Sequence, residues 1–189
     1  MPESIRSFLA VDLESDIVLR RLTTLQSLLV KTGADLKLVK PQNMHITIRF
    51  LGNIIPTMTE EIYFVMKKIQ FKPFTAHIKS LGAFPNPNYA RVIWAGIYQG
   101  AEQLKFIFNQ LEPLLQGLGF TPDPKGFSPH LTIARIRSAR NKVQLAKFIT
   151  ENANYEFGTI TVQTLRLKKS DITPSGPIYS TIREFCPQP

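Results

Sequence analysis

The stretches NMHITI, residues 43–48, and SPHLTI, residues 128–133, decide how this chain folds. Each contains a histidine followed two residues later by a threonine, each alternates polar with aliphatic side chains, and each follows a proline-containing loop. The recurrence of one pattern in both halves of a chain indicates an internal duplication. The sequence therefore predicts two similar halves, with repeats centred on residues 43–52 and 128–137.

Both motifs have the alternation of a β-strand, in which successive side chains point to opposite faces. His45 and Thr47 would then project about 7 Å apart from one face, and Ile46 would pack on the other. His130 and Thr132 repeat this arrangement in the second half. If the halves are related by a pseudo-twofold axis, we expect both histidines to face one cleft.

The rest of the chain contains helix and strand signals in alternation. Apolar residues at helical spacing predict helices over 14–31, 59–70, 102–118 and 142–152. Runs rich in β-forming residues predict strands over 7–13, 36–39, 44–51, 74–81, 91–97, 130–137, 158–168 and 178–185. Because several strands follow one another directly, an α+β fold with antiparallel sheets fits better than a parallel one. Pro113 should kink the third helix or split off its last turn.

Composition bounds the class of protein. The chain has 189 residues, of which 43% are hydrophobic and 20% charged, so it can bury a sizeable core and is not a disordered basic tail. No low-complexity linker divides it, and we expect one bilobed domain over residues 1–189. The net charge of +9 favours a polyanionic partner, although many basic proteins have only a solvated basic surface.

The single cysteine and the hydropathy pattern indicate the cellular compartment of the protein. Cys186 alone cannot form an internal disulfide or a four-ligand zinc site, and it favours the reducing cytoplasm. The N-terminal region lacks the basic flank and apolar run of a signal peptide. No window approaches the ~20 apolar residues of a membrane span. We expect a cytoplasmic monomer with no membrane partner.

Two histidines in equivalent positions suit concerted acid and base catalysis. Histidine titrates near ~6.5, so one imidazole can be neutral while the other is protonated. Cleavage of a phosphodiester uses such a pair, because one group removes a proton from the attacking water or hydroxyl and the other protonates the departing oxygen. The hydroxyls of Thr47 and Thr132 can donate hydrogen bonds to the non-bridging phosphate oxygens.

A metal site and a purely structural role are the competing interpretations of His45 and His130. No Asp or Glu lies within or immediately beside either motif, so we expect no metal and no other cofactor. A packing role gives no reason for both halves to keep the same polar pair. The third histidine, His77, lies outside the repeat and is expected to be a structural or exposed strand residue.

Five segments together resemble the 2H phosphoesterases, and specifically the RNA 2',3'-cyclic phosphodiesterases once called 2'-5' RNA ligases. They are FLAVDL (8–13), NMHITIRFLG (43–52), LGAFPNPNYARVIWAGI (81–97), FSPHLTIARI (127–136) and SDITPSGPIYSTIREF (170–185). The resemblance covers nearly the whole chain. It implies an α+β, bilobed, pseudo-twofold duplicated fold, in which two antiparallel β-sheets face a central cleft and helices pack on the outside.

The resemblance also implies a reaction, the metal-free hydrolysis of a 2',3'-cyclic phosphate at an RNA end to a 2'-phosphate. In that scheme His130 is the general base that activates water, and His45 is the general acid that protonates the departing 3'-oxygen. The residues alone do not fix which histidine is acid and which is base. Thr47 and Thr132 match the family's phosphate-contacting threonines. The reverse chemistry would give a minor 2'-5' RNA ligase activity.

Arg135 and Phe50 match two further family positions, a phosphate-site arginine and a residue implied to stack against a nucleobase. Each lies five residues after a motif histidine. In a straight strand both would point away from the phosphate, so these roles require a β-bulge or the end of a strand to re-aim them. The alternatives are a surface arginine and an ordinary core phenylalanine.

Other cations flank the motif strands and could line a groove that follows RNA phosphates. They are Lys37, Lys40, Arg49, Arg91, Lys125 and Arg137. Arg49 has the parity of His45 and Thr47, which makes it the best candidate among them. The RNA partner would carry a 2',3'-cyclic phosphate, as tRNA fragments or small nucleotides can. The alternative from another class is a catalytically inactive module that binds RNA ends or nucleotides.

Overall fold

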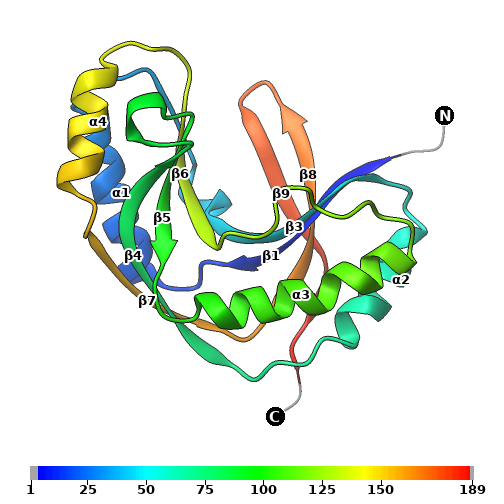
Figure 1. Ribbon diagram of the computed structural model, residues 1–189. Helices are drawn as coiled ribbons and strands as arrows, with labels where there is room; N and C mark the ends of the chain where they lie inside the picture. The colour runs from blue at the N-terminus through cyan, green and yellow to red at the C-terminus, as the bar shows by residue number, and fades with distance from the viewer. Residues whose placement is uncertain (1–3, 188–189) are drawn as a thin grey trace.

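A computed structural model describes residues 4–187 (Figure 1). In this range the helices are α1 (Asp16–Val30), α2 (Met58–Lys67), α3 (Ala101–Gly117) and α4 (Lys142–Glu151). The strands are β1 (Ile5–Asp12), β2 (Leu36–Leu38), β3 (His45–Ile54), β4 (Phe74–Phe84), β5 (Val92–Ile97), β6 (His130–Ile136), β7 (Glu156–Val162), β8 (Leu165–Thr173) and β9 (Gly176–Phe185). Two short 3-10 turns are η1 (Pro41–Asn43) and η2 (Pro87–Tyr89).

The strands form one antiparallel sheet that consists of two similar halves. The order is β7-β4-β5-β6-β3-β1-β8-β9, with β2 paired to β6. We call β3, β1, β8 and β9 the His45 lobe, and β6, β5, β4 and β7 the His130 lobe. The lobes join where β3 meets β6, through the single pair Ile46↔Leu131. The predicted α+β fold with antiparallel sheets is confirmed, and its two sheets are continuous at this one point.

Helix α1 illustrates how the sequence specifies the helices. It begins after Ser15, whose hydroxyl accepts a hydrogen bond from the Val18 amide at 3.4 Å and so caps the first turn. Val18, Leu22, Leu25 and Leu29 recur at helical spacing and are fully buried. This apolar stripe fixes which face of α1 packs on the sheet.

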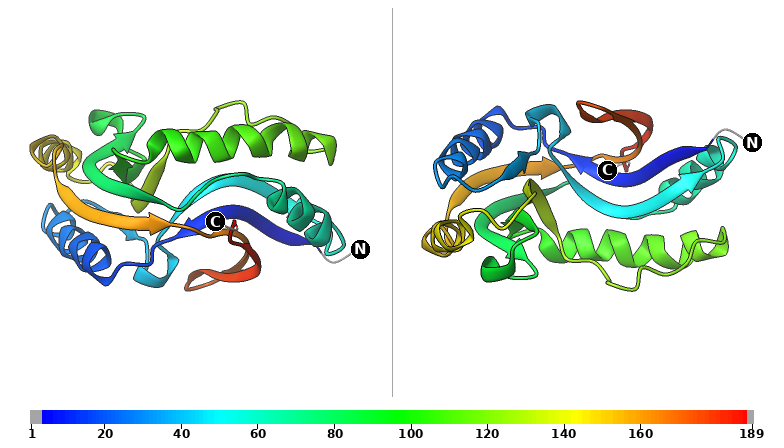
Figure 2. Two further views of the ribbon diagram at one scale, coloured as in Figure 1. Left: turned by 90° about the horizontal axis from the view of Figure 1, so that it is seen from below. Right: turned by 90° about the horizontal axis from the view of Figure 1, so that it is seen from above.

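Two of the helices, α1 and α3, are exchanged between the lobes. α1 follows β1 of the His45 lobe but packs on β6 and β7 of the His130 lobe, where Arg21 Nη1 donates to the Phe157 carbonyl at 3.3 Å and Gln26 Nε2 donates to the Ile133 carbonyl at 2.9 Å. In the same way α3 follows β5 but packs on β3 and α2. Figures 1 and 2 show α1 and α4 at one end of the sheet and α2 at the other, with α3 running from the middle of the molecule toward α2.

Two expectations about secondary structure are wrong. The single strand predicted over 158–168 is two strands in different lobes: β7 is the edge strand of the His130 lobe, and β8 lies between β1 and β9 in the His45 lobe. The alternation of apolar residues shifts by one position at this junction, from Ile160 and Val162 to Leu165 and Leu167, and this shift is the local sign of the change of strand. Of the two outcomes expected at Pro113, a kink or the loss of the last turn, the second is wrong, because α3 is continuous over Ala101–Gly117. The exposed position of Pro113 lets the helix accommodate the missing amide on the solvent side.

Each motif strand contains a β-bulge three residues after its histidine. The pairing of β3 with β1 skips Ile48, and the pairing of β6 with β5 skips Ile133. An unpaired residue reverses the alternation of the residues that follow it. Phe50 and Arg135 are therefore turned to the same side of their strands as the motif histidines, as their expected roles require.

The same bulge turns Arg49 away from that side. Arg49 is 9% exposed and forms an ion pair with Glu112 of α3, while its guanidinium also donates to the Phe50 carbonyl. The expectation that Arg49 lines the RNA groove is wrong, because the parity argument assumed a regular strand. Arg49 instead attaches the exchanged helix α3 to β3.

Replacement of Glu112 by Gln should lower the free energy of unfolding by about 3 kcal/mol, because it leaves the Arg49 charge buried without a counter-charge. Urea denaturation measures this loss. Glu102→Gln is the matched control on the same helix, since Glu102 is 82% exposed and pairs only with Lys105. The control should lose less than about 0.5 kcal/mol. Equal losses in both variants would contradict a structural role for the Arg49–Glu112 pair.

Candidate active site

A cleft of about 780 Å³ lies between the two lobes on the histidine side of the sheet. All six side chains singled out from the sequence line it, and they come from β3 and β6 alone. They are His45, Thr47, Phe50, His130, Thr132 and Arg135. The duplication therefore brings its two motifs to one site, as the pseudo-twofold arrangement predicts.

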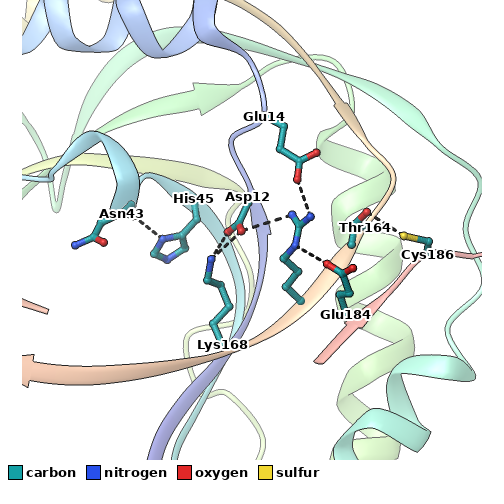
Figure 3. Close-up of polar contacts among 9 residues, drawn as sticks. Asp12, Glu14, Asn43, His45, Thr164, Lys168, Glu184 and Cys186 are labelled. Carbon is teal, nitrogen blue, oxygen red and sulfur yellow. Dashed lines mark hydrogen bonds and ion pairs between the residues drawn. The ribbon is translucent and has the colours of Figure 1, made fainter. Parts of the chain in front are cut away.

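His45 is held at both ring nitrogens. Its Nδ1 lies 2.7 Å from the Asn43 carbonyl oxygen, which can only accept, so Nδ1 carries a proton (Figure 3). Its Nε2 lies 2.9 Å from the Thr47 hydroxyl. The ring packs against Phe8 and Tyr179, with centroids 4.9 and 5.2 Å away. These contacts fix the orientation of the ring and leave Nε2 as the atom that can gain or lose a proton.

His130 repeats the arrangement of His45 at one nitrogen. Its Nδ1 lies 2.7 Å from the Ser128 carbonyl oxygen, again two residues earlier in the chain. The edge of its ring meets Phe84 of β4 with centroids 5.0 Å apart. The same tautomer follows, with Nε2 unprotonated in the neutral ring. Each histidine thus presents the same ring atom for chemistry.

Both histidines have lowered pKa values. Burial is the main cause in each case, because it disfavours the charged imidazolium. The charge of Lys168 lowers the pKa of His45 further, against the opposing hydrogen bond to Asn43, and the charge of Arg135 lowers the pKa of His130. At neutral pH the free protein therefore holds two mainly neutral imidazoles.

A partly buried charge network lies behind His45 and does not follow from the sequence analysis (Figure 3). Lys168, 8% exposed, donates to both carboxylate oxygens of Asp12 at 2.7 Å, and Asp12 is the cross-strand partner of His45. Arg166 contacts Asp12 at 3.5 Å and Glu14 at 2.6 Å. The only indication of this network in the sequence is Asp12, a charged residue directly after the apolar run 8–11. Its position does not indicate which residue it pairs with.

The charged side chains along the cleft are all basic. Within the described residues they are Arg6, Lys37, Lys40 and Arg135, and no acidic side chain lines the cleft. Lys37 and Lys40 thus line the cleft, as expected from the sequence. Arg91 and Arg137 line a neighbouring groove instead, and Lys125 lies outside the cleft. Part of the +9 charge is therefore gathered at the site of the two histidines.

The β8–β9 hairpin closes one side of the cleft. Asn43 Nδ2 donates to the Pro177 carbonyl at 2.8 Å, so the residue that orients His45 also anchors this hairpin. Tyr179 contributes to the lining, and burial raises the pKa of its phenol. Phe127, from the second motif loop, instead stacks on Phe108 of α3.

Other features lie outside the cleft. His77 pairs with Glu156 at 2.6 Å on the outer part of β4, which agrees with the expectation of a structural or exposed residue. Over residues 4–187 no group of three or more His, Cys, Asp or Glu side chains is placed to hold a metal ion. None of the helices in this range combines the length and apolar character needed to cross a bilayer.

Known proteins resemble this chain in sequence and in fold. An RNA 2',3'-cyclic phosphodiesterase of Aeropyrum pernix is 40% identical over 164 residues, 87% of this chain and 93% of the relative. One of Methanothermobacter thermautotrophicus is 34% identical over 183 residues, 96% and 98% of the two chains. The crystal structure of Escherichia coli LigT complexed with 3'-AMP matches with a TM-score of 0.80 at 20% identity, over 97% and 98% of the two chains.

The family match covers the residues of the site. The family model described as the AKAP7 2'5' RNA ligase-like domain matches residues 7–185, a range that includes both His-x-Thr motifs and both bulged strands. Together with the near full-length relatives, this match shows that the chain belongs to the 2H phosphoesterases of the 2'5' RNA ligase-like family.

Proposed function

We propose that this chain hydrolyses the 2',3'-cyclic phosphate at an RNA end to a 2'-phosphate, with His45 and His130 as an acid and base pair and without a metal. The observation that carries the proposal is the pairing of two imidazoles, each fixed at Nδ1 by a carbonyl, in one cleft whose charged lining is basic. The activity named for the relatives is RNA 2',3'-cyclic phosphodiesterase, which agrees with this chemistry.

The reaction needs one proton to be taken and one to be given. Nε2 of His130 takes a proton from water, whose oxygen attacks the phosphorus while the bond from phosphorus to the 3'-oxygen breaks. Nε2 of His45, protonated, gives its proton to that oxygen. The product carries a 2'-phosphate and a 3'-hydroxyl. His130 is then protonated and His45 neutral, and exchange with solvent restores both.

The anionic substrate supplies what the free site lacks. Burial lowers the pKa of His45, so the acid form is scarce in the free protein. A phosphate between the two rings favours the imidazolium by direct charge attraction. Binding and protonation of His45 are therefore coupled, and the reactive state is populated mainly when the cyclic phosphate is bound.

The remaining motif residues would hold the phosphate and the base. Thr47 and Thr132 each project from the same side of their strand as the neighbouring histidine and would donate to the non-bridging oxygens, whose charge grows in the transition state. Arg135 would neutralise the same charge. Phe50 is 57% exposed at the rim, where an apolar ring can stack on the terminal nucleobase.

Replacement of either motif histidine by Gln should lower kcat/KM for a cyclic-phosphate oligonucleotide by about a hundred- to ten-thousand-fold, the usual contribution of a general acid or base. Circular dichroism should show that both variants remain folded, and EDTA should leave the wild-type rate unchanged. His77→Gln is the matched control, because His77 pairs with Glu156 outside the cleft. Full activity in either motif variant would reject the proposal, and RNA binding without turnover by the wild type would favour the inactive binding module.

The pH profile should identify the acid and the base. The base must be neutral and the acid protonated, so kcat/KM falls on both sides of a maximum, with apparent pKa values that belong to the coupled pair. Because both pKa values are lowered from 6.5, the maximum should lie on the acidic side of that value.

Lys168→Gln removes a charge that lowers the pKa of His45 and leaves Asp12 to raise it. If His45 is the acid, the alkaline limb of the profile moves to higher pH, since His45 stays protonated longer. Lys168→Arg keeps the charge and should leave the limb in place. A shift of the acidic limb instead would reverse the two roles.

A further inference from the structure

A second groove, of about 700 Å³, adjoins the active-site cleft on the His130 lobe. It lies between η2, the end of β6 and the start of α4. Phe84 and Val92 line both the cleft and this second groove, so the two adjoin at these residues. Because Phe84 also meets the edge of His130, the second groove begins beside a motif histidine.

The second groove is strongly basic. Arg91, Arg137, Arg140 and Lys142 line it, and no acidic side chain does. Across residues 4–187 none of these four cations has an acidic partner within ion-pair distance. Arg140 is held in place, since its Nε donates to the Gly33 carbonyl at 2.9 Å. Four like charges gathered without counter-charge repel one another and form a site for an anion.

The basic residues of the cleft and of the second groove are neighbours along the chain, and we call Arg135, Arg137 and Arg91 the basic row. Arg135 of β6 lines the cleft, and Arg137, just after the end of β6, lines the second groove. Arg91 lies next to Val92, the cross-strand partner of Arg135. A polyanion that leaves the cleft along this row meets successive cations.

An exposed aromatic ring stands beside these cations. Tyr89 is 72% exposed and lines the second groove. Its backbone is fixed, because the Asn86 side chain accepts hydrogen bonds from the amides of Asn88 and Tyr89, both at 3.1 Å. An exposed ring on a fixed backbone next to positive charge is the arrangement on which single-stranded nucleic acids stack their bases.

We propose that the second groove binds the RNA strand on the 5' side of the cyclic end, with its phosphates against the four cations and a base against Tyr89. This inference rests on the proposed function. A 2',3'-cyclic phosphate is by its chemistry at the 3' end of a strand, so the rest of the strand extends in the 5' direction and must leave the cleft. The substrate class is then a single-stranded oligonucleotide, which binds better than a nucleoside cyclic phosphate.

The double variant Arg137→Gln/Lys142→Gln tests the basic half of the proposal. The probes are adenosine 2',3'-cyclic phosphate and a single-stranded RNA of about ten nucleotides with the same end. For the RNA, kcat/KM should fall about tenfold at low salt, and the slope of log affinity against log salt should become shallower by about 0.7 per lost phosphate contact. For the mononucleotide, kcat/KM should not change. Lys31→Gln/Lys68→Gln, which removes two exposed cations that line neither groove, should match the wild type for both probes.

Tyr89→Ala tests the aromatic half. Loss of a stacked base should weaken binding of the RNA at least about fivefold while leaving the mononucleotide unaffected. Tyr98→Ala is the matched control, because Tyr98 is 76% exposed but packs on His77 away from both grooves.

The outcomes separate this inference from the function on which it rests. Wild-type RNA kinetics and salt slope in the double variant would overturn the second-groove proposal, and would leave an acidic protein surface as the occupant to consider. Equal losses for RNA and mononucleotide would also overturn it, because the effect would then lie in the cleft. Failure of the wild type to hydrolyse either probe would instead reject the proposed function, and binding of the RNA measured by fluorescence anisotropy would still test the groove.

Discussion

The site depends on one antiparallel pair, Ile46↔Leu131, at which β3 of one lobe meets β6 of the other. Ile46 and Leu131 are fully buried, so strand alternation directs the residues before them, His45 and His130, to the opposite face. A local twofold axis between antiparallel strands relates the two histidines to one another. Their approach therefore follows from backbone pairing and needs no loop to bring them together, which suits a reaction in which two rings must reach one phosphate.

Much of this arrangement could be predicted from the sequence because the duplication is visible in two short motifs. The face of His45, Thr47, His130 and Thr132 follows from period-two alternation alone. The face of Arg49 cannot be predicted from alternation, because β3 has a bulge at Ile48. The hydropathy pattern does not reveal this bulge, since both Ile48 and Arg49 are buried. For Phe50 and Arg135 the sequence could state only that a bulge was required.

Long-range pairings account for the features that the sequence did not predict. The boundary between β7 and β8 coincides with a one-position shift in the apolar alternation after Val162, but that shift does not tell which lobe each strand joins. The partnership of Asp12 with Lys168 spans almost the whole chain, and the segment FLAVDL that contains Asp12 does not indicate its partner. The exchange of α1 and α3 between lobes likewise depends on apolar faces that would suit either sheet. Such choices follow from the three-dimensional arrangement and not from local propensity.

The exchange of helices also bears on how the protein assembles. β1, at the start of the chain, has β8 as one of its two neighbours, and the His45 lobe is completed only when β8 and β9 have joined it. The His130 lobe in turn needs α1 from the first part of the chain and β7 from the last. Neither half of the duplicated sequence contains a complete lobe. During synthesis the cleft therefore cannot form before the last strands have been made. A chain that lacks these strands would expose the unpaired edge of β1 and would have no partial activity.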